Sequence, residues 1–244
     1  MNLQTPAKDE PGAPQPRPGR AANPAEPGVG DLLPYVAPMF AFLALTSLEA
    51  YLPEGWYPLA YAAKVAIVSM VAIYFRAAWS DLRPLPRIGA VTLAVVVGLI
   101  VYVLWVRLDG LYPPLSFLGK RTGFDPTAIP SGGRQAFIAV RLFGLVLLVP
   151  LIEELFWRSF LMRWIINPNF LEVPVGRVTP AAAGITSAAF ALAHPEWLPA
   201  ILTGLLWAGL LWRTRSLFAC FVSHLVANLA LGIHVLSTGE WRYW

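Results

Sequence analysis

Three short stretches of this chain place polar side chains inside runs of apolar residues. Residues 150–158 read Pro-Leu-Ile-Glu-Glu-Leu-Phe-Trp-Arg, so two adjacent carboxylates, Glu153 and Glu154, share an apolar run with Arg158. His194 ends a second apolar run, and a third contains Ser-His-Leu-Val-Ala-Asn at residues 223–228. Ionisable groups inside long apolar segments are rare and mark candidate functional sites by default.

On a helix, the two adjacent carboxylates of Glu153 and Glu154 point in different directions. Glu154 and Arg158 are one helical turn apart and can form an ion pair. Glu153 lies about 100° around the helix from Glu154 and faces elsewhere. The spacing of four in Phe190–His194 and His224–Asn228 puts each pair on one helical face.

These residue types are sufficient for peptide hydrolysis. A carboxylate in surroundings of low dielectric can act as general base to a water molecule, and a histidine can hold the same water. A histidine and an asparagine one turn apart, such as His224 and Asn228, can donate hydrogen bonds to the oxyanion of a tetrahedral intermediate. The candidate catalytic residues are therefore Glu153, Glu154, Arg158, His194, His224 and Asn228.

The same set contains ligands for zinc, and Glu153, His194 and His224 would be the ligands if a metal were used. The chain lacks a His-Glu-x-x-His motif, and no two of its three histidines share a helical turn. Cys220 is the lone cysteine, which excludes both an intrachain disulfide and a Cys-rich zinc site. No cofactor follows with certainty, and zinc stays an open alternative.

Each motif also has a purely structural interpretation. Glu154 and Arg158 could form an ion pair that serves the fold alone. His224 and Asn228 could make interhelical hydrogen bonds, since polar residues join membrane helices. His194, directly before a proline, could cap the end of a helix.

The composition indicates an integral membrane protein. Hydrophobic residues make up 57% of the chain and charged residues 13%, against about 25% charged residues in soluble domains. The net charge of +4 fits short cytoplasmic loops and requires no nucleic-acid partner. The expected partners are the lipid bilayer and a membrane-associated peptide or protein.

The apolar pattern predicts an all-α, polytopic transmembrane bundle of about seven spans. A disordered, Pro-rich tail is expected over 1–30, N-terminal helices and a long polar loop over 31–133, and a protease-like core over 134–244. The fifth and sixth spans are shorter than the ~20 residues of a full crossing, which favours a re-entrant hairpin. Lys64 and Arg141 are expected as interfacial anchors. The predicted spans are 32–52, 57–79, 88–106, 135–166, 180–193, 200–212 and 217–236.

Loop arginines predict the orientation in the membrane. They follow the second, fourth and sixth spans, and the one exception is the long loop after the third span, with Lys120, Arg121 and Arg134. The balance favours a cytoplasmic N-terminus and an external C-terminus. At 1.5 Å per residue, Glu153, His224 and His194 lie roughly 15, 12 and 21 Å into their helices, which brackets the middle of a ~30 Å core. The three side chains can therefore converge at one depth.

Taken together, Glu-Glu-x-x-x-Arg, Phe-x-x-x-His and His-x-x-x-Asn, in this order, resemble the CAAX prenyl protease and bacteriocin-processing (Abi) family of intramembrane proteases. The resemblance covers roughly residues 134–236. It implies that Glu153 and His194 activate water and that His224 and Asn228 stabilise the oxyanion. The family is often labelled metallopeptidase, although a metal-independent glutamate mechanism is also argued for it.

Composition and length resemble the bacterial branch of that family, which places the protein in a bacterial inner membrane. The substrate stays open between a peptide precursor, a membrane-anchored sorting tail and a prenylated protein. The rival interpretation is a non-enzymatic scaffold or transporter that uses the charged cluster as a proton or ion relay. A relay would line a path open to both faces, whereas a protease requires one enclosed cavity.

Overall fold

The structure is a computed structural model that describes residues 27–119 and 123–244. Most of the predicted tail, and Lys120 and Arg121 of the predicted polar loop, lie outside these residues. The described chain is all-helical, as expected, with no strand. Its principal helices are α1 (Val29–Glu49), α2 (Tyr57–Tyr74), α3 (Ile88–Arg107), the long helix Ser131–Ile166, α7 (Pro180–Leu192), α8 (Trp197–Thr214) and α9 (Leu217–Thr238).

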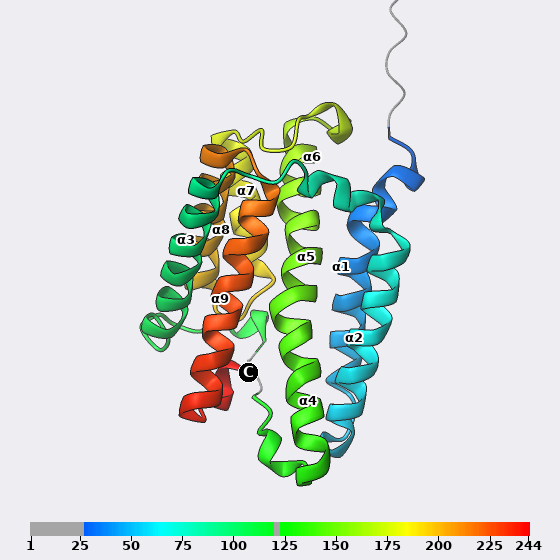
Figure 1. Ribbon diagram of the computed structural model, residues 1–244, viewed down its shortest axis with the longest axis vertical. Helices are drawn as coiled ribbons and strands as arrows, with labels where there is room; N and C mark the ends of the chain where they lie inside the picture. The colour runs from blue at the N-terminus through cyan, green and yellow to red at the C-terminus, as the bar shows by residue number, and fades with distance from the viewer. Residues whose placement is uncertain (1–26, 120–122) are drawn as a thin grey trace, which may run out of the picture.

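The long helix Ser131–Ile166 runs through the middle of the bundle (Figure 1). Helices α1 and α2 lie on one side of it, and α3, α7, α8 and α9 lie on the other. Its α-helical parts are α4 (Ser131–Phe143), α5 (Val149–Glu153) and α6 (Met162–Ile166), separated by π-helical turns at Gly144–Leu148 and Glu154–Leu161. Such turns are rare and are common at functional sites.

The first π-helical turn has an identifiable cause in the sequence. Pro150 has no N–H to give to the carbonyl four residues earlier, so the regular α-helical pattern cannot continue through it. The N–H of Val149 instead bonds the Gly144 carbonyl, five residues earlier. The Leu145 carbonyl thereby loses its α-helical partner, the N–H of Val149. In the π-helical pattern its donor would be the next residue, Pro150, which has no N–H.

Close backbone contacts bring the C-terminal helices together. A Cβ atom on Gly98 of α3 would lie 2.4 Å from the Ser223 carbonyl oxygen of α9, and one on Gly204 of α8 would lie 2.8 Å from Ser187 Cβ of α7. Small residues at these crossings let helix backbones approach closely. The α3–α9 and α7–α8 contacts therefore fix α9, which carries His224, and α7, which His194 follows, relative to their neighbours.

Several predicted helix bounds differ from the structure: α2 ends at Tyr74 rather than residue 79, and the long helix begins at Ser131 rather than residue 135. Helix α1 begins at Val29, inside the range expected to be tail, and α8 begins at Trp197 rather than residue 200. Five helices are long and apolar enough to cross a membrane among the described residues, and α7 is a shorter apolar helix. The count of seven spans stays a prediction.

The expectation that Lys64 and Arg141 anchor the chain at the membrane interface was wrong. Lys64 is buried, with its Nζ atom 2.5 Å from Glu49 Oε2. Arg141 is buried as well, with its guanidinium 4.7 Å from the ring centre of Tyr61. Both cations find partners on neighbouring helices, an opposite charge for Lys64 and an aromatic face for Arg141, and they join α1, α2 and α4.

Candidate active site

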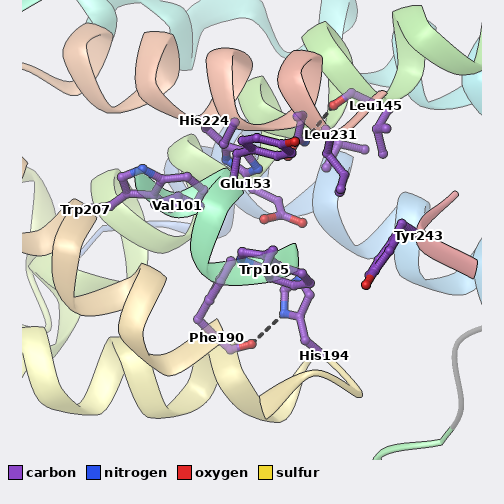
Figure 2. A pocket seen from close by; sticks show the side chains of 14 residues that line it. Val101, Trp105, Leu145, Glu153, Phe190, His194, Trp207, His224, Leu231 and Tyr243 are labelled. Atoms are coloured by element: carbon purple, nitrogen blue, oxygen red, sulfur yellow. Dashed lines mark hydrogen bonds between the residues drawn. The ribbon is translucent and has the colours of Figure 1, made fainter. Parts of the chain in front are cut away.

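One cavity of about 130 Å³ brings the three motifs together. Glu153, His194, His224 and Asn228 all line it, although they come from three helical segments far apart in the sequence. The remaining lining residues are mostly apolar or aromatic, and they include Trp105, Phe190 and Trp207. Figure 2 shows the Glu153 carboxylate pointing into this cavity between His224 and His194.

Glu153 is deeply buried and incompletely bonded. Glu153 is 5% exposed, and its Oε2 atom has no hydrogen-bond partner among the described residues. An unsatisfied carboxylate oxygen in an apolar interior is costly unless a water or ligand completes its bonding. The cavity in front of Glu153 is the place where such a molecule can bind.

Glu154 faces away from Glu153, as the helical spacing predicted, and it has two partners. Arg158 Nη1 lies 3.1 Å from Glu154 Oε1, which confirms the expected pair. The Nδ1 atom of His224 lies 2.9 Å from the same oxygen. A carboxylate only accepts hydrogen bonds, so His224 must carry its proton on Nδ1 and use Nε2 for other contacts.

Two aromatic rings enclose Arg158, and one of them, Trp207, also packs against His224. The Arg158 guanidinium lies 4.8 Å from the ring centres of both Phe190 and Trp207. The Trp207 ring also lies 4.2 Å from the His224 imidazole, and its Nε1–H donates to Ser223 Oγ at 3.0 Å. Sequence reasoning missed Trp207, because nothing in the spacing along α8 relates it to α9.

His194 lies just beyond the end of α7. Its Nδ1 atom is 2.7 Å from the carbonyl oxygen of Phe190, and because that oxygen can only accept, Nδ1–H is the donor. The bond caps the helix end, as the structural interpretation proposed, and it also fixes the imidazole at the cavity. Nε2 then carries the ring's lone pair, as required of a group that accepts a hydrogen bond from water.

Asn228 makes the interhelical hydrogen bond that its structural interpretation expected. Its Nδ2 atom donates to the Leu145 carbonyl oxygen at 2.8 Å, the same carbonyl that the π-helical turn before Pro150 leaves without a helical partner. An amide nitrogen has two N–H groups, so one bond to Leu145 leaves a second donor on a side chain that lines the cavity. The one feature of the sequence that relates to this contact is Pro150, because it leaves the Leu145 carbonyl free to accept a hydrogen bond from another helix.

The conditional metal set is not assembled. Glu153, His194 and His224 share the cavity, but within 27–119 and 123–244 no three His, Cys, Asp or Glu side chains are grouped as metal ligands. His224 and His194 each use Nδ1 for a protein contact, the second contact that metal-binding histidines also make. The grouping of the side chains alone therefore argues against a three-ligand zinc site among the described residues.

The comparison with known families agrees with the geometry. Residues 135–230 match the family model "Rce1-like", described as type II CAAX prenyl endopeptidase Rce1-like. This segment of the chain is Rce1-like. The Rce1-like segment contains every candidate catalytic residue and lies within the range expected from the three motifs. No curated protein and no solved structure matches the chain.

The Rce1-like family indicates a peptidase of the CAAX prenyl endopeptidase type. The apolar helices and this match together indicate an integral membrane protein, and a peptidase of this type acts on a peptide or protein. Helices α1, α2 and α3 lie outside the matched range.

Proposed function

We propose that the protein is an intramembrane endopeptidase in which Glu153 is the general base. The observation that carries this proposal is that the incompletely bonded Glu153 carboxylate shares one cavity with His194, His224 and Asn228. A general base must face the water that it deprotonates, and geometry is the first criterion for assigning it. The proposed substrate is a membrane-associated peptide or protein.

The proposed reaction begins with one water bound between Glu153 and His194. Glu153 takes a proton as the water oxygen attacks the carbon of the scissile carbonyl, which forms a tetrahedral intermediate with a negatively charged oxygen. The intermediate then collapses, the C–N bond breaks, and Glu153 returns the proton to the leaving amine. The products are a new carboxyl terminus and a new amino terminus.

His224 and Asn228 are the proposed donors to the developing oxyanion. Because Glu154 faces Nδ1, His224 can donate from Nε2 only when both of its nitrogens carry protons. The Glu154 carboxylate is placed to balance the charge of such an imidazolium, in addition to that of Arg158. Asn228 would contribute the amide N–H that Leu145 does not use.

Glu154 and Arg158 have supporting roles in this proposal. Neither residue lines the cavity, and both are almost fully buried, at 0% and 1% exposed. They hold His224 and the aromatic rings beside it rather than touching the substrate. No step of the proposed reaction uses a metal, because Glu153 takes the proton from water and His224 and Asn228 are the proposed donors to the oxyanion.

The aromatic lining of the cavity favours a peptidase over the rival function, a proton or ion relay. A relay needs a chain of polar groups between the two faces, whereas Trp207 and Phe190 cover the inner side of the cavity next to Arg158. The orientation proposed from loop arginines, with a cytoplasmic N-terminus in a bacterial inner membrane, is compatible with either function.

The test is cleavage by the full chain reconstituted in phospholipid vesicles. The probes are an internally quenched, farnesylated peptide with a CAAX-type C-terminus, the same peptide without the lipid, and an apolar membrane-spanning peptide. The proposal expects cleavage of at least one probe and no proton flux when a pH gradient is imposed. Proton flux with all three probes intact would overturn the peptidase proposal in favour of the relay.

A further inference from the structure

A second, larger hollow lies on the outer surface of the bundle, between α3 and α8. It encloses about 600 Å³, within the roughly 300–1,000 Å³ of small-ligand pockets. Its walls are aliphatic, mainly Leu93, Val97 and Leu104 of α3 and Leu202 and Leu206 of α8. No residue that lines it also lines the catalytic cavity, so the groove is a separate feature.

The length of this groove matches one leaflet of a bilayer. Its lining on α8 extends from Leu202 to Arg213, which is roughly 16 Å at 1.5 Å per residue. Half of the ~30 Å hydrocarbon core is about 15 Å. One extended acyl chain, running from the headgroup level to the middle of the membrane, therefore has the length of the groove.

A single charge stands at one end of the groove. Arg213, in the last turn of α8, is the one ionisable residue among its lining residues. Its side chain is exposed and makes no hydrogen bond or ion pair within 27–119 and 123–244. By contrast, the nearby Arg215 donates to the Gly176 carbonyl oxygen at 2.7 Å. An exposed guanidinium at headgroup level attracts the phosphate of an anionic lipid.

We propose that the groove between α3 and α8 binds one acyl chain of an anionic phospholipid, with Arg213 contacting its headgroup. The aliphatic walls accept the chain, and the position of the charge selects the headgroup. This site is independent of peptide cleavage, so it would exist whether or not the cavity is catalytic.

Gly209 makes the groove testable without disturbing the fold. It lines the groove, and a Cβ atom added there meets nothing within 4 Å. Gly209→Leu should therefore fill the groove from α8. Gly184→Leu is its matched control, because Gly184 is also an exposed helical glycine whose added Cβ meets nothing within 4 Å, but it lies on α7 outside the groove.

The experiment is native mass spectrometry of the full chain in detergent, titrated with dioleoylphosphatidylglycerol or dioleoylphosphatidylcholine. The wild type and Gly184→Leu should retain one tightly bound phosphatidylglycerol, and Gly209→Leu should lose it. Arg213→Gln should weaken that binding about fivefold, as expected for one arginine facing an anionic headgroup. Arg177→Gln, which removes another exposed arginine outside the groove, should have no effect.

The proposal fails if Gly209→Leu retains phosphatidylglycerol as well as the wild type does. It also fails if Gly184→Leu loses the lipid to the same extent, because binding would then be general to the apolar surface. Equal retention of phosphatidylcholine and phosphatidylglycerol by the wild type would overturn the assignment to an anionic lipid.

Discussion

The Nδ1 atom of His224 lies 2.9 Å from Oε1 of Glu154, although the two residues are 70 positions apart in the chain. The same oxygen accepts from Arg158, one turn further along its own helix. Glu154 thus connects an intrahelical ion pair to a histidine of the cavity. This contact gives the second glutamate of the Glu-Glu pair a positioning role distinct from that of Glu153.

Replacing Arg158 with alanine should destabilise the protein. The change leaves the fully buried Glu154 carboxylate without its cationic partner, and breaking a buried pair in this way typically costs about 3–5 kcal/mol in the free energy of unfolding. Denaturant unfolding in mixed micelles measures the effect. Arg177→Ala, at an exposed arginine outside the groove between α3 and α8, is the control and should change stability little. A wild-type unfolding curve for Arg158→Ala would refute the structural role.

Removing the Asn228 side chain should slow catalysis while the fold stays intact. Asn228→Ala should lower kcat by about 10²–10³ if the side chain donates to the oxyanion. The interhelical bond alone would cost only about 0.6 kcal/mol of stability and leave kcat unchanged. Turnover and thermal unfolding of the same variant in detergent separate the two outcomes, and wild-type turnover would remove the oxyanion assignment.

Pro150 should affect catalysis without touching the substrate. Pro150→Ala restores an N–H to the helix, which lets the π-helical turn revert and returns the Leu145 carbonyl to a backbone donor. Asn228 would lose its anchor, and misplacing a catalytic group by about 1 Å can cost about 10²-fold in rate. We expect lower kcat with retained or increased thermal stability. Unchanged kcat would show that Asn228 does not depend on this carbonyl.

The α7–α8 contact should be sensitive to one methyl group. In Gly204→Ala the new Cβ would lie 2.8–2.9 Å from Ser187, so the helices must separate, at a cost of about 1–3 kcal/mol in stability. Gly209→Ala is the matched control on the same helix, where the Cβ meets open space and helix propensity favours alanine by about 1 kcal/mol. The melting temperature should therefore fall in Gly204→Ala and rise in Gly209→Ala. Equal shifts in the two variants would contradict the close α7–α8 contact at Gly204.

Much of the site could be predicted from the sequence because its elements are local. Helical periodicity alone separates Glu153 from Glu154 and pairs Glu154 with Arg158, and the structure has both features. Depth along each helix showed that Glu153, His194 and His224 can lie at one level, and all three line the cavity. The aromatic enclosure by Trp207 could not be predicted, because it depends on how α8 crosses α9 rather than on any spacing within one helix.

The incorrect predictions share a physical cause. Lys64 was expected to extend toward the interface because of its long stem, yet it pairs with Glu49 of the preceding helix. Helix α8 was expected to begin after Pro199, but a proline in the first helical turn loses no hydrogen bond, and the helix begins at Trp197. In both cases local rules allowed two outcomes; packing against α1 decided between them for Lys64, whereas Pro199 was compatible with either start of α8.

The central claim, that Glu153 is the general base, is tested most directly by Glu153→Gln in the vesicle cleavage assay. Glutamine keeps the size and polarity of the side chain but cannot take a proton from water. The rate should fall by about 10²–10⁴, the usual contribution of a general base, while the melting temperature is unchanged or higher because a buried, incompletely bonded carboxylate is removed. A Glu153→Gln protein that cleaves the probe at the wild-type rate would show that Glu153 is not the general base.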